Sequence, residues 1–305
     1  MEPFEVHILG CGSALPTTRH NATSQIVRIC NKQFMIDCGE GTQLQMRGSH
    51  IHFSFVNHIF ISHLHGDHCF GLIGLISTFG LLGRTAPLHI YADPLLQRLM
   101  QAQLNFFCNG LKYQLHFHDI DATKQMVIYE DKSITVETIP LQHRIPCCGF
   151  LFKEKPKKRH LIASMIEYYN IPIHQRAGIK EGNDYTTPDG TLVPNSRLTT
   201  DAAPSRSYAF CSDTLPCPGI VEQIKEVDLL YHEATFAEAE ESRAKETFHS
   251  TARQAAQIAK EANVKQLIIG HFSSRYKDDE PLLNEAKEIF PKTSLADENK
   301  VYNIE

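Results

Sequence analysis

The chain has 305 residues, a formal net charge of −5 and a hydrophobic content of 42%, as expected for one large globular domain or two small ones. This acidity excludes nucleic-acid binding through overall positive charge, although it leaves room for a local basic surface. The N-terminus lacks a basic segment followed by a long apolar run. The longest apolar stretch covers residues 70–83. It is shorter than a membrane span, which needs about 18 apolar residues. Export and membrane insertion are therefore not expected.

The nine cysteines and seventeen histidines carry different information. The cysteines are scattered without a C-x-x-C pair, whereas a disulfide framework or a thiolate zinc site shows regular spacing. We therefore expect a reduced, cytoplasmic protein. The histidines are the unusual feature, because imidazole is the commonest neutral metal ligand and the usual proton carrier near neutral pH.

Strand-like and helical patterns are mixed along the whole chain. In chain order they predict strands at 4–9, 25–29, 33–37 and 58–62, a helix at 69–82, a strand at 88–92, a helix at 94–106, strands at 134–139, 149–152 and 208–212, a helix at 220–226, a strand at 227–232, helices at 237–245 and 251–262, a strand at 266–271 and a helix at 281–289. This mixture predicts a layered α/β or α+β domain.

The hexapeptide HLHGDH directly follows the predicted strand 58–62. Histidines at i and i+2 on extended backbone point to the same side, so His63 and His65 can share one metal ion. The glycine that follows permits a tight turn that presents Asp67 and His68 toward a second ion. Four candidate ligands within six residues are difficult to explain by packing or by chance.

Further ligands are needed to complete two coordination shells. The candidates are His143 in PLQHRIP, Asp213 in CSDT and His271 in IIGHFSSRY. Each lies at or just past the C-terminal end of a predicted strand, where α/β architectures gather their ligands. A single histidine at a strand end is more often a hydrogen-bonded structural residue, but as a set the three complete the ligand count.

The segment 153–205 differs from the rest of the chain, because it is rich in charge, proline, glycine and asparagine. Over 153–180, seven Lys and Arg residues stand against two Glu residues. One interpretation is a solvated loop that keeps the chain soluble. The other is a basic arm inserted into an acidic domain.

Several further motifs accompany HLHGDH: LGCGSALP, IDCGEGTQLQM, GDHCFGLIGL, PLQH, SDT, HEATF, FHSTARQAA and GHFSSRY. With them the chain resembles the ribonuclease Z family, the tRNA 3′-processing endonucleases of the metallo-β-lactamase superfamily, over nearly its whole length. The resemblance implies an α/β fold, the αββα metallo-β-lactamase sandwich, with two zinc ions and a flexible arm at 153–205 that grips RNA. It implies seven ligands: His63, His65 and His143 at one ion, Asp67, His68 and His271 at the other, and Asp213 as the bridge.

The resemblance also implies that Glu233 and His249 form a proton-donating pair, and that Asp67 orients the attacking water or accepts its proton. A structural interpretation of the same motifs remains open. Glu233 is then a solvated residue at a strand end. Ser250 is then the N-cap of the helix 251–262, which places His249 directly before a helix N-terminus that favours a phosphate.

We therefore expect a cytoplasmic, homodimeric, zinc-dependent endoribonuclease that removes the 3′ trailer from precursor tRNA and leaves a 3′-hydroxyl, without a membrane partner. His/Asp sites also suit manganese and iron. One alternative is another hydrolase of the superfamily, acting on a small phosphodiester or thioester; HEATF, FHSTARQAA and the basic segment argue against it. The other is a non-catalytic zinc-binding module, which has no need of a proton donor.

Overall fold

The computed structural model describes residues 2–15, 17–298 and 300–305, so Pro16, the last residue of LGCGSALP, lies outside the described residues. The chain divides into two compact units. The first is Met1–Lys153 together with Arg206–Glu305, and the second is Glu154–Ser205. The second unit therefore coincides with the segment that the sequence sets apart.

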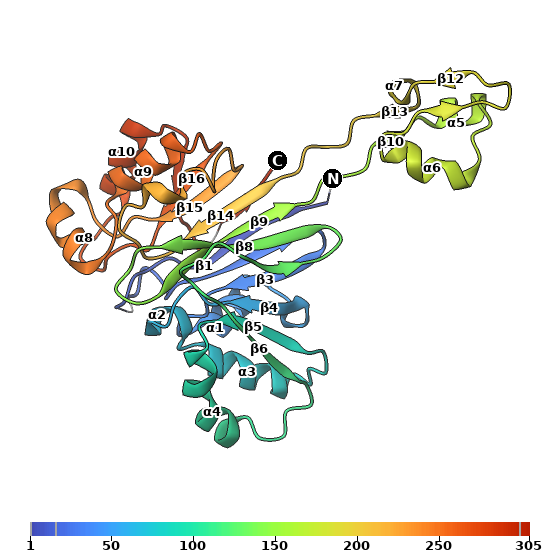
Figure 1. Ribbon diagram of the computed structural model, residues 1–305. Helices are drawn as coiled ribbons and strands as arrows, with labels where there is room; N and C mark the ends of the chain where they lie inside the picture. Colours follow the sequence, from blue (N-terminus) through green and yellow to red (C-terminus); the bar gives the residue numbers. More distant parts are fainter. Residues whose placement is uncertain (1, 16, 299) are drawn as a thin grey trace. The chain divides into compact units, whose positions relative to one another are not determined.

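Two seven-stranded sheets form the centre of the first unit (Figure 1). The first sheet contains, in spatial order, β18 (Val301–Asn303), β1 (Phe4–Gly10), β2 (Ser24–Ile29), β3 (Lys32–Ile36), β4 (Val56–Phe60), β5 (Leu88–Ala92) and β6 (Leu115–Asp119). The strands from β3 to β6 pair in parallel. Their C-terminal ends therefore meet at one edge of the sheet.

The second sheet has the same number of strands. It contains, in spatial order, β17 (Thr293–Leu295), β16 (Leu267–Gly270), β15 (Leu229–Glu233), β14 (Ser207–Cys211), β9 (Cys147–Glu154), β8 (Ile134–Leu141) and β7 (Val127–Glu130). The strands from β14 to β17 pair in parallel. This sheet too therefore gathers several strand ends at one edge.

Helices cover the outer face of each sheet (Figure 1). Beside the first sheet lie α1 (Thr42–Gly48), α2 (Gly66–Cys69), α3 (Leu72–Leu81) and α4 (Leu95–Phe107), with the short 3-10 helix η1 (Phe53–Phe55). Beside the second lie α8 (Glu241–Thr247), α9 (Ala252–Glu261) and α10 (Glu280–Ile289), with the 3-10 helices η2 (Pro218–Ile220) and η3 (Glu238–Glu240). The layers run helix, sheet, sheet, helix, and the predicted αββα sandwich is confirmed.

Strand alternation explains how the first sheet is buried on both faces. In β4 the ring of Phe60 joins the core between the two sheets, whereas Ile59 joins the core beneath α3 and α4. All three side chains from Ile59 to Ile61 are almost fully buried. Burial of such a side chain contributes about 1.5–3 kcal/mol, so β4 holds the chain firmly up to the point where the HLHGDH motif begins.

The second unit has a small core of its own. Its elements are β10 (His160–Leu161), α5 (Ala163–Tyr168), α6 (Ile173–Lys180), β11 (Tyr185–Thr186), β12 (Leu192–Val193), α7 (Asn195–Leu198) and β13 (Thr199–Thr200). They enclose the buried side chains of Ile166, Ile171, Ile179, Tyr185, Val193 and Leu198. The interpretation of this segment as a solvated loop is therefore wrong. Seven Lys and Arg residues stand against six Asp and Glu residues over Glu154–Ser205, a net charge of +1.

The predicted helices at 69–82 and 220–226 differ most from the structure, and the one at 237–245 begins as η3 before α8. The helix expected at 69–82 is interrupted between α2 and α3, because the backbone of Gly71 packs against the loop after β3. A Cβ added to Gly71 would lie 2.0 Å from the carbonyl oxygen of Gly39. The helix expected at 220–226 is replaced by η2 and irregular turns, which end at Glu226 with a φ of 58°.

Two global expectations concern the membrane and the cysteines. None of the helices within the described ranges is long and apolar enough to cross a membrane. None of the nine cysteines, all of which lie within the described residues, takes part in a disulfide, and most of them are buried.

Candidate metal centre

The seven predicted ligands come from strand ends of both sheets in the first unit. His63 and His65 follow β4, and Asp67 and His68 lie in α2 directly after them. The other three follow β8, β14 and β16, respectively: His143, Asp213 and His271. Residues more than 200 positions apart, such as His68 and His271, thereby come within contact distance.

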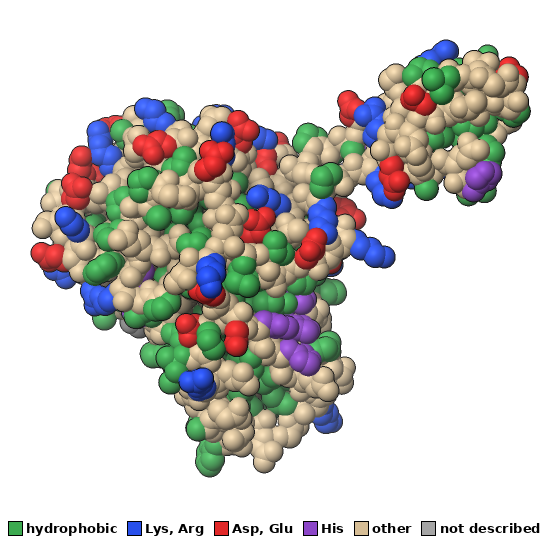
Figure 2. Space-filling view, in the orientation of Figure 1, with side chains coloured by type: hydrophobic (Ala, Val, Ile, Leu, Met, Phe, Trp, Pro, Cys, Tyr) green, Lys and Arg blue, Asp and Glu red, His purple; other side chains and the backbone are tan. Residues whose placement is uncertain are grey.

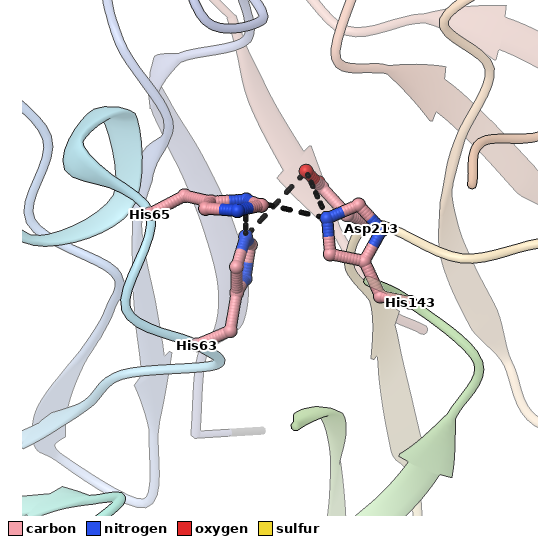
Figure 3. Close-up of side chains that lie close together, drawn as sticks. All are labelled: His63, His65, His143 and Asp213. Atoms are coloured by element: carbon pink, nitrogen blue, oxygen red, sulfur yellow. Dashed lines mark hydrogen bonds and ion pairs between the residues drawn. The ribbon is translucent and has the colours of Figure 1, made fainter. Parts of the chain in front are cut away.

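The first group of ligand atoms consists of three imidazoles and one carboxylate that point toward one another (Figure 3). His65 Nδ1 lies 3.0 Å from His63 Nε2 and 3.2 Å from His143 Nε2. Asp213 Oδ2 lies 3.6 Å from His63 Nε2 and 3.8 Å from His143 Nε2. Two ligand atoms of one tetrahedral zinc ion lie about 3.3 Å apart, given bonds of about 2.0–2.1 Å, so this group has the spacing of a metal site.

The second group shares Asp213 with the first. Asp213 Oδ1 lies 3.4 Å from His68 Nε2 and 3.2 Å from His271 Nε2. Asp67 Oδ2 lies 3.5 Å and 3.4 Å from the same two nitrogens. Asp213 Oδ1 is buried and has no hydrogen-bond donor among the described residues. A buried carboxylate oxygen that faces imidazole nitrogens fits a bridge between two cations.

The outer nitrogens of the histidines are held by partners that the sequence reasoning missed. The contacts are His68 Nδ1 to Asp37 Oδ2 at 2.7 Å, His143 Nδ1 to the Phe248 carbonyl at 2.8 Å, His271 Nδ1 to Thr235 Oγ1 at 2.9 Å and His63 Nδ1 to Ser62 Oγ at 3.0 Å. Such partners fix the tautomer and orientation of a ligating histidine. Asp37 had a signal, because it stands at the start of the DCGEG stretch directly after a strand.

At His63 and Asp213 the electrostatics favour the ionisation states that metal ligands require. At His68, burial alone would lower the pKa, but the carboxylates of Asp213 and Asp37 raise it. Burial lowers the pKa of His63 well below its ordinary value, and the neighbouring His68 lowers it further. Burial alone would raise the pKa of Asp213, but the imidazoles of His271 and His68 lower it well below its usual range. A neutral imidazole and an ionised carboxylate are the binding forms of these ligands. The residues present therefore fit a pair of divalent cations.

Glu233 and His249 meet beside this centre. His249 Nδ1 lies 3.0 Å from Glu233 Oε1. Glu233 is fully buried and accepts hydrogen bonds from the backbone N–H groups of Thr214, Thr235 and Ser250. Burial alone would lower the pKa of His249, but the Glu233 carboxylate raises it to about 9. The interpretation of Glu233 as a solvated residue is therefore wrong.

The helix behind this pair begins one residue later than predicted. Thr251, not Ser250, is the N-cap of α9, and it forms a reciprocal capping box with Gln254. Ser250 instead donates its hydroxyl to the Thr214 carbonyl and its N–H to Glu233. His249 therefore lies two residues before the cap, and its position is set by Glu233 rather than by the helix end.

An open cleft of about 550 Å³ gives access to the centre. Five of the predicted ligands and His249 contribute to its lining, together with residues that the sequence reasoning did not single out. Among these, Arg144 and Phe70 offer a cationic and an apolar contact at the cleft. A centre that is reached through a broad opening can accept part of a macromolecule as well as a small molecule.

The two-sheet sandwich with its histidine and aspartate cluster defines a protein of the metallo-β-lactamase fold. Solved structures show the same fold: human tRNase Z, short form, aligns with a TM-score of 0.71 and 26% identity over 99% of both chains. The metallo-β-lactamase fold protein YhfI from Bacillus subtilis aligns with a TM-score of 0.69 and 16% identity, also over 99% of both chains.

Sequence relatives narrow this class. The ribonuclease Z of Bacteroides fragilis (strain YCH46) is 62% identical over 299 residues, and that of Porphyromonas gingivalis (strain W83) is 55% identical over 298 residues, each covering 98% of both chains. The chain belongs to the ribonuclease Z family, and the resemblance noted in the sequence is confirmed. A family model described as Anti-Pycsar protein Apyc1 also matches residues 4–169.

Proposed function

We propose that the protein is a zinc-dependent endoribonuclease that removes the 3′ trailer from precursor tRNA and leaves a 3′-hydroxyl on the tRNA. The observation that carries the proposal is the Glu233–His249 pair beside seven converging ligands, in a chain whose relatives are named ribonuclease Z. A binding module has no use for a buried carboxylate that holds a cationic imidazole at an open cleft.

Seven side chains hold two zinc ions in this proposal, in the two groups described above with Asp213 shared between them. Bound there, the ions supply Lewis acidity that lowers the pKa of water and stabilises negative charge on phosphoryl oxygens. The chain itself contributes the fixed geometry. The outer partners of the histidines, such as Asp37 and Thr235, keep each ring in its ligating orientation.

Asp67 orients the attacking water and accepts its proton. Its Oδ2 accepts a hydrogen bond of 2.8 Å from the backbone N–H of Ala14, in the loop that follows β1. This contact fixes the carboxylate at the edge of the cleft, which Ala14 and Asp67 both line. A positioned carboxylate of this kind is a suitable general base.

His249 donates a proton to the departing 3′-oxygen. Its Nδ1 faces Glu233, so the other ring nitrogen is available to a substrate in the cleft that His249 lines. A proton supplied at this point prevents a poor alkoxide leaving group from building up charge. Glu233 keeps the imidazole charged and correctly oriented.

The second unit, Glu154–Ser205, is the arm that grips the tRNA in this proposal. Some of its charged side chains form ion pairs within the unit; for example, Lys158 Nζ lies 2.7 Å from Glu181 Oε1. Exposed apolar side chains also lie on it, including Tyr168 and Ile173. RNA contacts through shape and stacking, as well as through phosphates, suit such a surface.

We further propose that the protein acts in the cytoplasm as a homodimer. Large apolar side chains on α3 and α4 are exposed, among them Leu81 at 86% and Phe106 at 79%. Because α3 and α4 are in contact, exposed apolar side chains on these two helices suit a protein interface. The molar mass in solution tests this part of the proposal.

The decisive experiment incubates the purified, zinc-loaded protein with a pool of precursor RNAs and maps the cut ends. We expect cleavage directly after the tRNA body, with a 3′-hydroxyl on the tRNA and a 5′-phosphate on the trailer. Cleavage of small phosphodiesters with no action on any precursor tRNA would refute the proposal and favour the alternative hydrolase.

A further inference from the structure

A second cluster of metal-ligand types lies in the first unit, outside the centre described above. It combines Cys11, directly after β1, His20 in the loop before β2, and Glu298 between β17 and β18. Cys11 is fully buried, and the side chains of His20 and Glu298 are 18% and 13% exposed. A thiol, an imidazole and a carboxylate are the three side-chain types that zinc prefers.

The ligand atoms have the spacing of one coordination sphere. Cys11 Sγ lies 3.4 Å from His20 Nδ1 and 3.7 Å from Glu298 Oε1, and the latter two atoms are 4.0 Å apart. Bonds of about 2.0–2.3 Å in tetrahedral geometry place ligand atoms about 3.3–3.6 Å apart. Shifts of a few tenths of an ångström therefore bring all three atoms onto one ion.

The outer nitrogen of His20 supplies an independent observation. His20 Nε2 lies 2.7 Å from Asp279 Oδ2, and Arg19 also binds this carboxylate. The carboxylate favours the tautomer with the proton on Nε2, which directs the Nδ1 lone pair toward Cys11 and Glu298, whereas Arg19 Nη2, 3.0 Å from Nε2, favours the other tautomer. The arrangement repeats that of His68 with Asp37 at the main centre, and it is the usual outer support of a ligating histidine.

We propose that Cys11, His20 and Glu298 form a separate site for one divalent cation of the zinc type, with the fourth position open to water. The thiolate and the carboxylate balance the two charges of the ion, while Asp279 is balanced by Arg19. The alternative is a network of hydrogen bonds only, because Glu298 also accepts hydrogen bonds from the backbone N–H groups of Cys11 and Asn21.

The position of this site gives it a structural effect on the main centre. Cys11 and His20 flank the loop whose Ala14 N–H donates to Asp67. Glu298 ties the same loop to the C-terminal segment. An ion bound here would therefore hold the loop against Asp67 without touching the substrate, and we assign it a positioning role.

Cobalt(II) substitution tests the proposal, because a thiolate ligand produces a near-ultraviolet charge-transfer band with cobalt. The main centre has only histidine and aspartate ligands and produces no such band. We expect the band when the metal-depleted full chain is reloaded with cobalt. It should disappear in Cys11→Ser and persist in Cys108→Ser, a matched change at a buried thiol outside both sites. By elemental analysis, Cys11→Ser should hold one zinc ion per chain fewer than Cys108→Ser.

Two further variants keep the test sound if Cys11→Ser folds poorly. Glu298→Gln keeps an oxygen for the backbone N–H groups but loses the charge, and Asp279→Asn weakens both the outer support of His20 and the ion pair with Arg19. Each variant should lower the affinity of this site for cobalt by about tenfold or more, as measured by the growth of the charge-transfer band during titration. The proposal is overturned if the wild-type chain shows no band. It is equally overturned if the band is lost in Cys147→Ser, because Cys147 Sγ lies near His63 at the main centre.

Discussion

Glu233 organises three parts of the chain through one buried carboxylate. It accepts N–H groups from the segment after β14, from the residues that follow β15 and from the turn before α9. Its charge in turn raises the pKa of His249. A carboxylate buried without such donors would cost several kcal/mol, so the hydrogen bonds and the imidazole are what allow it to remain charged in this position.

The proton-donor role of His249 predicts a split between substrates. His249→Ala should slow cleavage of precursor tRNA by roughly 10²–10⁴, because the 3′-oxygen needs a proton as it departs. Hydrolysis of a nitrophenyl phosphodiester should change little, since its leaving group is far more acidic. Rates on both substrates and the zinc content provide the measurement.

Matched variants separate this role from a general loss of activity. Asp67→Ala should damage both reactions, because in the proposed mechanism Asp67 acts on the attacking water and belongs to the ligand cluster. Glu233→Gln should give a milder split than His249→Ala. If His249→Ala lost the same fraction of its rate on both substrates and retained its zinc, the proton-donor role would be wrong and His249 would be purely structural.

The sharing of Asp213 predicts a characteristic pattern of metal loss. Asp213→Ala should weaken the binding of both ions at the main centre, because the two oxygens of Asp213 face different groups of histidines. Asp37→Asn should weaken mainly binding of the ion held by His68, by about 10–100-fold. The effect at the other ion should be smaller, and it arises because Asp37 also binds Ser62, the partner of His63. Titration of the metal-depleted protein with zinc measures both effects. If Asp213→Ala removed one ion and left the other at full affinity, the carboxylate would not be a bridge.

At the scale of elements, parallel pairing lines up histidines on the inner face of the first sheet. His58 of β4 is the register partner of His89 in β5, which is the partner of His116 in β6. Their rings stack at 5.0 Å and 4.9 Å between centroids. Histidines gather on the visible surface below the second sheet (Figure 2).

This row of histidines predicts that the fold becomes less stable as the pH falls. Burial, together with the charges of His89 and His118, lowers the pKa of His58 to about 4, whereas an unfolded histidine titrates near about 6.5. Between these values the unfolded chain binds the extra proton, so stability falls as the pH falls from about 6.5 toward 4. Asp131 opposes this shift and Lys32 adds to it.

A variant isolates the contribution of His58. His58→Phe should reduce the loss of unfolding free energy between pH 7 and pH 5 by about 1 kcal/mol, a value that allows for solvent screening. Urea denaturation at the two pH values measures it. Tyr129→Phe keeps the ring that contacts His58 and should behave as the wild type does. An unchanged pH dependence in His58→Phe would contradict the assignment.

At the scale of the whole molecule, the second unit is inserted in the chain between two strands of the first unit that pair with each other. Lys153 at the end of β9 and Ser207 at the start of β14 are register partners, so a short Gly/Ser linker can replace Glu154–Ser205 as a hairpin turn. The second unit has its own core, and the metal centre lies entirely in the first. Removal of the second unit should therefore leave the centre intact.

This deletion predicts a substrate-dependent effect. We expect KM for precursor tRNA to rise about tenfold or more, with little change for a nitrophenyl phosphodiester, because only remote binding energy is lost. The salt dependence of RNA binding should flatten only slightly, since the net charge of the unit is +1. Comparable losses on both substrates would mean that the second unit supports the centre itself.

The sequence by itself determined the class of site, because ligand type and local spacing are properties of short segments. HLHGDH after a strand was sufficient to predict His63 and His65 as partners, and strand ends predicted His143, Asp213 and His271. The same reasoning failed where the deciding contact was distant. The N-cap moved from Ser250 to Thr251 because Glu233, from another strand, takes the Ser250 N–H.

Only the tertiary structure decided which remote residue contacts the outer nitrogen of each ligand histidine. Asp37 and His68 are 31 positions apart, and His143 and the Phe248 carbonyl are 105 positions apart. No local pattern encodes which carboxylate or carbonyl will meet a given ring nitrogen. That choice follows from the register and packing of two sheets, because hydrogen bonds require their atoms to lie within about 3 Å, and only the folded chain sets distances between remote segments.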